Sequence, residues 1–207
     1  MSSFKSLNKA LKTPDLVRTL KLNTKQENLP SELFTLKNLE SLYIQSSTLT
    51  SIPSQISQLK KLRTLYISSE KLTSLPRELL VIPTLETLSL NACRIRTVDM
   101  EIGLSSNLKS LILSHNQLQN LPLNLEHLES LKLLNLNNNE LKEFPKQLLN
   151  LTSLEKLYLD HNQLQTIPTS WIKKLKRLNI ISLDNNQFSL KEKEKIQNEL
   201  NYCFEEI

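Results

Sequence analysis

Leucine and other large apolar residues recur along this chain at fixed intervals that fit neither a single helix nor a single strand. The recurring frame is LxxLxLxxNxLxxLPxxLxxLxx, in which x is mostly polar. A repeat of this length cannot bury its apolar face alone, so the pattern predicts a solenoid of stacked repeats. Copies spaced 23 residues apart begin at Leu39, Leu62, Leu85, Leu108, Leu131 and Leu154.

Each copy is expected to contribute one short parallel strand at its LxLxx segment, where alternate residues point inward. The fold class is therefore an α/β solenoid with one parallel sheet. An asparagine at the ninth place of the frame can both donate to and accept from the turns of neighbouring repeats. A ladder of such residues is predicted at Asn116, Asn139, Asn162 and Asn186. Earlier copies should be looser, because their ninth places hold Ser47, Glu70 and Cys93.

Both ends of the solenoid need a cover, because an open end would expose apolar surface and unpaired strand groups. At the front, Phe4, Leu7 and Leu11 share one face of a predicted helix. At the back, Ser189 followed by Glu192 is typical of a capping box that starts a helix. We expect one domain over 1–207, made of a helical cap (1–15), about eight repeats (16–190) and a second helical cap (189–207).

Three copies depart from the frame. The first (17–38) is one residue short. The copy from Leu85 has Asp99 in place of proline, so its side opposite the strand is expected to be irregular through residue 103. The copy from Leu154 is one residue longer than the 23-residue frame, and places Trp171 in a slot that should point into the core.

Composition excludes several classes of function. The single glycine, Gly103, leaves no Gly-rich phosphate loop and no dinucleotide fingerprint. A net charge of +5 is too mild for a nucleic-acid footprint, so no nucleic-acid partner is expected. No stretch is apolar over the roughly 20 residues of a membrane span. The start lacks the apolar run of a secretory signal, which favours the cytoplasm. Cys93 and Cys203 lack the spacing of a disulfide or zinc site.

The repeats resemble the leucine-rich repeat superfamily, in its 23-residue LP type, over 16–190. The terminal segments LNKALKTPDLVRTLKL and NNQFSLKEKEKIQNELNYC are similar to those of short leptospiral leucine-rich repeat proteins. The resemblance implies a horseshoe with its parallel sheet on the concave side. It also implies a bacterial protein that recognises other proteins without being an enzyme, and a secreted or surface-exposed position in contact with a host.

In such a horseshoe, the strand residues that do not point inward line the concave face. The fifth place of the frame holds three of the four tyrosines of the chain. Tyrosine supplies a large, rigid contact area with a polar tip, so a partner-binding surface is predicted there. The expected anchors, in which Ile112 and Leu133 form an apolar patch, are Tyr43, Tyr66, Ile112, Leu133 and Tyr158. Lys21, Lys156 and Asp160 are expected to set orientation and association rate. The alternative is that tyrosine and isoleucine simply favour strands.

Chemistry beyond binding has weak support in the sequence. The metal-ligand candidates are His115, His161, Asp160 and Asp184. The two histidines should lie two strands, about 10 Å, apart, so neither a metal nor another cofactor is expected. Cys203 has no neighbour to lower its pKa, so we expect a small buried residue rather than a nucleophile.

Two other modes of association remain open. A basic cluster on the convex side could contact an acidic partner or a membrane surface, and consists of Trp171, Lys173, Lys174, Lys176 and Arg177. A weakly capped end could instead let the protein associate with itself as a structural scaffold, although a monomer is expected.

Overall fold

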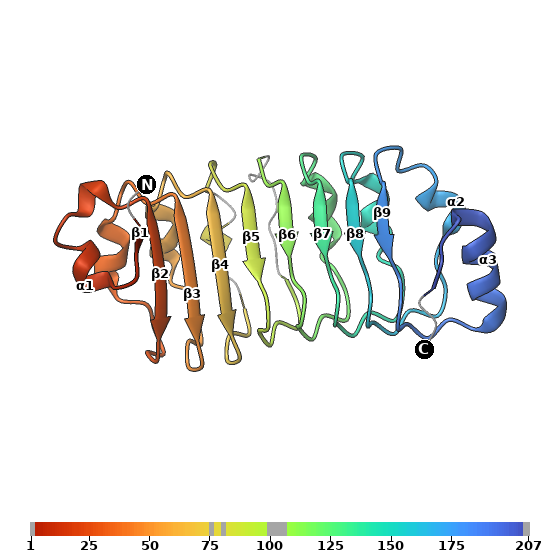
Figure 1. Ribbon diagram of the computed structural model, residues 1–207, viewed down its shortest axis with the longest axis horizontal. Helices are drawn as coiled ribbons and strands as arrows, with labels where there is room; N and C mark the ends of the chain where they lie inside the picture. The colour runs from red at the N-terminus through yellow and green to blue at the C-terminus, as the bar shows by residue number, and fades with distance from the viewer. Residues whose placement is uncertain (1–2, 75–76, 80–81, 99–106, 205–207) are drawn as a thin grey trace.

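The computed structural model describes residues 3–74, 77–79, 82–98 and 107–204. Within these residues, nine strands form one parallel sheet in sequence order, as Figure 1 shows. The strands are β1 (Ser3–Phe4), β2 (Thr19–Thr24), β3 (Ser41–Ser46), β4 (Thr64–Ser69), β5 (Thr87–Leu90), β6 (Ser110–Ile112), β7 (Leu133–Asn135), β8 (Lys156–Tyr158) and β9 (Ile180–Ser182). The structure thus confirms the predicted solenoid with a parallel sheet.

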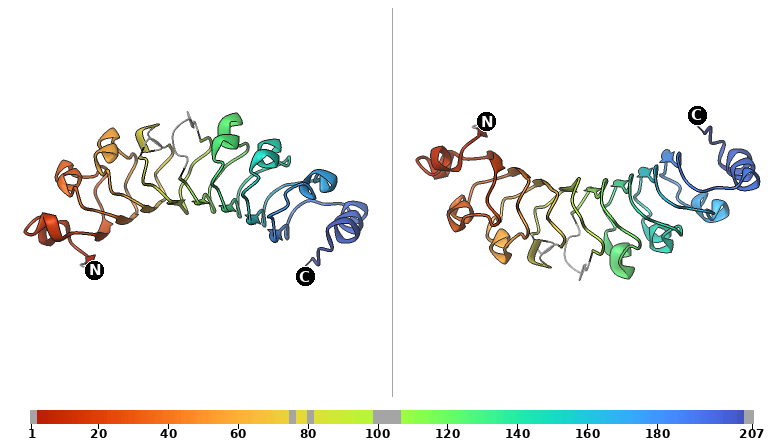
Figure 2. Two further views of the ribbon diagram at one scale, coloured as in Figure 1. Left: turned by 90° about the horizontal axis from the view of Figure 1, so that it is seen from above. Right: turned by 90° about the horizontal axis from the view of Figure 1, so that it is seen from below.

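Short helices line the side opposite the sheet. Figure 2 shows the repeats following a shallow arc, with the strands on its inner side, the helices between strands on its outer side, and α1 (Leu7–Ala10) and α3 (Leu190–Leu200) at its two ends. Proline precedes several of them at extended φ values of −64° to −72°, which its ring fixes. The other helices are η1 (Pro14–Leu16), η2 (Ser31–Thr35), η3 (Ser54–Gln58), η4 (Arg77–Leu79), η5 (Leu123–His127), η6 (Lys146–Asn150) and α2 (Thr169–Ile172).

The core runs between these two sides. The first, fourth and sixth places of the frame point inward, so that Leu131, Leu134 and Leu136 are fully buried. Each such side chain contributes about 1.5–3 kcal/mol relative to an exposed one. Repeats share one continuous core from Ala10 to Ile196, so no repeat is expected to stand alone.

The asparagine ladder is confirmed. Asn139 donates from Nδ2 to the carbonyl oxygens of Leu113 (2.9 Å) and Leu136 (3.0 Å), and its Oδ1 accepts from the backbone N–H of Leu118 at 3.0 Å. Asn116 and Asn162 make the corresponding bonds. The side chain of each asparagine therefore satisfies backbone groups of its own turn and of the preceding repeat.

The early repeats have no asparagine ladder, and their backbone at the eighth and ninth places differs from what the frame predicts. From Ala92 onward the eighth place adopts positive φ, and the residues concerned are Ala92, His115, Asn138, His161 and Asn185. This left-handed residue turns the ninth place inward. In β3 and β4 the chain stays extended through the eighth place instead, so Ser46 and Ser69 point inward and Glu70 is exposed. Glu70 therefore does not occupy a ladder position.

The N-terminal end differs from its prediction. Phe4 lies in the short strand β1, which pairs with β2, and α1 is a single helical turn. The prediction of a helix with Phe4, Leu7 and Leu11 on one face is therefore wrong. These three side chains still pack, partly buried, against the core.

At the C-terminal end, α3 begins where the capping box predicts. The Ser189 hydroxyl accepts a hydrogen bond from the Glu192 N–H at 3.2 Å. The Glu192 carboxylate does not return to Ser189 but accepts the backbone N–H of Ile167 at 3.1 Å, which ties α3 to the preceding repeat. Ile196 of α3 is fully buried.

The irregularity expected from Asp99 through residue 103 lies outside the described residues. Among the described residues, no helix is long and apolar enough to cross a membrane.

Candidate functional site

The sheet register aligns equivalent places of successive repeats across the concave face. The fifth place forms one continuous row, in which each residue pairs with the next: Lys21, Tyr43, Tyr66, Ser89, Ile112, Asn135, Tyr158 and Ser182. The row therefore has three bulky parts, the first with Tyr43 and Tyr66, the second Ile112 and the third Tyr158, separated by the smaller polar Ser89 and Asn135.

The N-terminal part of this row is a stack. The rings of Tyr43 and Tyr66 lie parallel within 5°, with centroids 4.9 Å apart. Lys21 places its Nζ 5.2 Å from the centroid of the Tyr43 ring, a cation–π contact. Contacts of these two kinds contribute about 0.5–1.5 kcal/mol each and favour this arrangement of the side chains. The stack is thus one connected surface rather than a set of independent tyrosines.

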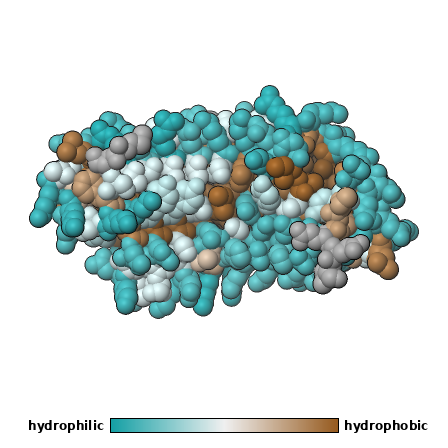
Figure 3. All heavy atoms as spheres, viewed as in Figure 1, coloured by the Kyte–Doolittle hydropathy of each residue, from teal (hydrophilic) through white to brown (hydrophobic). Residues whose placement is uncertain are grey.

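A groove of about 750 Å³ runs along this stack. It brings together four of the predicted binding residues, Lys21, Tyr43, Tyr66 and Ile112. In Figure 3 the surface here is mainly weakly polar, with hydrophobic residues below and beside it. We call this the N-terminal groove, and its other lining residues are Lys5, Leu22, Asn23, Ile44, Gln45, Ile67, Ser68, Ser89, Asn91, Ser114 and His115.

Some of these lining residues were missed by the sequence reasoning. Five are at the seventh place, one step further along the outward-facing alternation than the rows considered: Asn23, Gln45, Ser68, Asn91 and Ser114. The same period-two pattern could have found them. Lys5 precedes the first repeat, and only the fold of the N-terminal segment places it at the groove.

The remaining predicted anchors do not line this groove. Leu133 and Lys156 are partners in the third-place row, and Tyr158 follows Lys156 in β8. Together with Ile180, which is 39% exposed, they form a second concave surface over the last strands, where Figure 3 shows hydrophobic residues gathered. Leu133 pairs with Ser110 rather than Ile112, so the expected apolar pair is diagonal.

Asp160 is engaged within the fold. Its Oδ1 accepts the backbone N–H of Asp184 at 2.9 Å, and its Oδ2 accepts from Asn137 Nδ2 at 3.1 Å. Its carboxylate therefore joins two neighbouring turns, which is a structural use that the sequence did not indicate.

The two metal-ligand histidines occupy the left-handed eighth place of their repeats, and both are exposed. His161 Nε2 lies 3.3 Å from Asn185 Nδ2. In the part of the chain that the structure describes, no group of three or more His, Cys, Asp or Glu residues could hold a metal ion, and this includes His115, Asp160 and Asp184.

Two predictions of burial are wrong. Cys203 is exposed, whereas Cys93 is buried, which raises the pKa of its thiol. Trp171 is 41% exposed, because Ile172 takes the core slot of that repeat at 5% exposure. The basic residues beside Trp171 are exposed as well, and Lys173 lies 3.9 Å from the Glu199 carboxylate.

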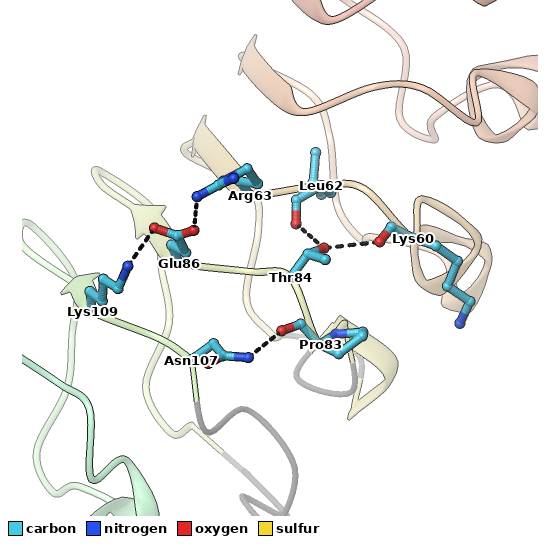
Figure 4. A network of polar contacts seen from close by, with 8 residues as sticks. All are labelled: Lys60, Leu62, Arg63, Pro83, Thr84, Glu86, Asn107 and Lys109. Atoms are coloured by element: carbon cyan, nitrogen blue, oxygen red, sulfur yellow. Dashed lines mark hydrogen bonds and ion pairs between the residues drawn. The ribbon is translucent and has the colours of Figure 1, made fainter.

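A row of charged residues follows the edge where the strands begin. Figure 4 shows Glu86 between Arg63 and Lys109, with Lys109 Nζ 2.9 Å from its carboxylate. The hydrogen bond from Lys109 and the charges of both cations hold the pKa of Glu86 below its usual value. In the same view, Asn107 Nδ2 donates to the Pro83 carbonyl at 2.8 Å. These contacts link successive repeats along the edge.

Comparison with known proteins identifies the architecture. Residues 106–164 and 152–198 match the family model of the leucine rich repeat. A solved leucine-rich repeat protein of Leptospira interrogans is 34% identical, with a TM-score of 0.74 over 96% of this chain and 57% of that one. Two solved internalins of Listeria monocytogenes are 22% and 28% identical, with TM-scores of 0.71 and 0.66, over 89% and 81% of this chain and 53% and 70% of theirs. This chain thus spans less than two thirds of the first two structures. The comparison with curated proteins found no match.

Proposed function

Because this chain is a leucine-rich repeat protein, we propose that it binds a protein partner through its concave face, at the N-terminal groove. Leucine-rich repeat proteins generally act as scaffolds for protein binding. The observation that carries the proposal is the stack of Lys21, Tyr43 and Tyr66 beside a groove. Rigid tyrosines bind at a low entropy cost, which favours this surface as the contact.

Site-specific crosslinking tests the proposal. A photoreactive amino acid is placed at position 66 in the groove, and in a second protein at position 146, where the exposed Lys146 belongs to η6 on the convex side. Irradiation in bacterial lysate and in eukaryotic cell lysate is followed by mass spectrometry. The proposal predicts a partner crosslinked at 66 and not at 146. The reverse result would assign binding to the convex side and overturn it.

Self-association of this chain must be distinguished from binding to a different protein. If the chain is a module that binds another protein, gel filtration over a range of protein concentrations should show an unchanged monomer. A size that grows with concentration, with crosslinks at 66 joining two copies of this chain, would favour a scaffold role.

The location of the protein is part of the same proposal. Similarity to leucine-rich repeat proteins of two bacteria supports a bacterial origin, and we propose that the protein is secreted or surface-exposed and acts in contact with a host. Fractionation of the producing cell tests this, since recovery in the cytoplasm alone would contradict it.

A further inference from the structure

The fifth-place row contains one gap inside the N-terminal groove. Ser89 of β5 stands between Tyr66 of β4 and Ile112 of β6, and it pairs with both across the sheet. Its side chain ends at a single hydroxyl, while its two neighbours are large, and all three line the groove. Ser89 is only 4% exposed, so it forms a narrow floor between two walls. We call this gap the Ser89 slot.

The spacing of the strands on either side of Ser89 matches that of one inserted planar group. Neighbouring strands lie about 4.8 Å apart, so Tyr66 and Ile112 stand about 9.6 Å apart at their backbones. On the other side of Tyr66, the Tyr43 ring stacks at 4.9 Å from the adjacent strand. A ring inserted over Ser89 would meet Tyr66 at the same spacing and contact Ile112 with its opposite face. It would continue the stack that the protein itself builds with Tyr43.

The charges around the slot are of one sign. Lys5 and Lys21 line the same groove, whereas none of its described lining residues is Asp or Glu. Neither lysine makes an ion pair with another described residue. Their charge is therefore available to a bound segment, and complementary charge raises association rates and excludes basic partners.

We propose that the Ser89 slot receives an aromatic side chain from an acidic segment of the partner protein. This inference rests on the proposed function and specifies the chemistry of the partner. Ser68 and Asn91, at the seventh place beside the slot, and Gln45 on the next strand, supply polar groups for the backbone of such a segment.

We test the proposal by titrating the full chain with synthetic peptides and measuring binding from the NMR chemical shifts of its backbone amides. The probe is a short peptide whose central tyrosine is flanked by glutamates. One comparison peptide has alanine at the centre and another has lysine flanks. We expect the probe to bind about fivefold or more tightly than either, since one stacked ring and the charge of the groove each account for such a factor. Equal binding of all three peptides would overturn the proposal.

Filling the slot supplies the matched test. In Ser89→Tyr the new ring occupies the slot and extends the stack of Tyr43 and Tyr66, so the fold should survive while the probe loses at least about fivefold in affinity. Thr87→Tyr adds the same ring to β5 on the same face but outside the groove, and should bind like wild type. If Ser89→Tyr does not fold, Ile112→Ala removes the opposite wall and should weaken the probe instead. Undiminished binding in the folded variant overturns the proposal.

A neutral glucan oligosaccharide is titrated in the same way as the peptides, because sugar rings also stack on tyrosine. If it shifts the Ser89 and Ile112 amides while the peptides do not, the slot has a different ligand and the inference fails. A protein that crosslinks at position 66 while the peptides show no preference leaves the proposed function intact and overturns only the slot. Peptide binding without any crosslinked protein at 66 would contradict the proposed function instead.

Discussion

Tyr202 donates a hydrogen bond from its phenolic oxygen to the carboxylate of Asp184, 3.0 Å away. The same oxygen accepts the backbone N–H of Leu183 at 2.8 Å. The segment that follows α3 is thereby joined to the turn of the last repeat. Burial, with the Asp184 carboxylate beside it, raises the pKa of Tyr202 well above its ordinary value.

Tyr202→Phe should lower the free energy of unfolding by about 1–3 kcal/mol, because the Leu183 N–H loses its acceptor. The difference should depend on pH. Since the folded pKa lies above the unfolded one, the contribution is complete below about pH 10 and is lost as the pH rises further. Urea denaturation of both proteins from about pH 8 to about pH 11 measures this. A gap between them that stays constant over this range would contradict the prediction.

Asn139→Ala should destabilise the protein by about 2–3 kcal/mol, because it removes bonds that satisfy buried backbone in two repeats. The control is Ser47→Ala, at the same place of an early repeat where the side chain is exposed; it should change stability by less than about 0.5 kcal/mol. Urea denaturation again gives both values, and equal losses would show that the ninth place has one role in every repeat.

Ala92→Gly should stabilise the protein by about 0.5–1 kcal/mol. Ala92 has a φ of 53°, a conformation in which its Cβ is strained and glycine is not. Part of that gain is offset by the greater freedom of glycine in the unfolded chain. The matched substitution Ala10→Gly, in the helical turn α1, should destabilise instead. The prediction fails if thermal or chemical unfolding shows both variants to be weakened.

Glu86→Gln should cost less than about 1 kcal/mol, because its partners Arg63 and Lys109 are largely exposed. Because the pKa of Glu86 is lowered in the folded state, its contribution is present above about pH 4.3 and is lost as the pH falls. The loss should shrink at high salt. Glu143→Gln, at an exposed position, serves as the surface control. An effect of Glu86→Gln that is independent of salt and pH would contradict this account.

Tyr66→Asp should abolish partner binding while Tyr158→Asp preserves it, because only Tyr66 lines the N-terminal groove. Both residues are half-exposed on the same face, so both variants should keep the circular dichroism of the wild type. Pull-down of the crosslinked partner compares them. Binding that survives Tyr66→Asp, or that is lost only in Tyr158→Asp, would move the contact to the C-terminal strands.

The sequence predicted the fold because its repeat imposes one register on every copy. Leucines at the first, fourth and sixth places can be buried only if each copy forms the same strand and stacks on the next. The fifth-place row from Lys21 to Ser182 follows from that register alone. The asparagine ladder from Asn116 onward could be predicted for the same reason.

Deviations from the repeat depend on backbone conformation, which cannot be read from the amino-acid sequence of the repeat. Glu70 and Asn139 share the ninth place, yet one is exposed and the other buried, because the residue before Asn139 has positive φ and the one before Glu70 does not. Likewise, Trp171 and Ile172 are adjacent apolar residues in a repeat of altered length, and only the packing of α2 determines which of them is buried.

The sequence by itself determined which residues of each repeat strand line the concave face, since strand alternation leaves them no other side. Only the tertiary structure decided which of them act together. Tyr43 stacks on Tyr66, Lys5 is brought to their groove from outside the repeats, and Asp160 is drawn into bonds between turns. The physical reason is that a period fixes the direction of each side chain, whereas its contacts depend on the conformation of neighbours from other repeats.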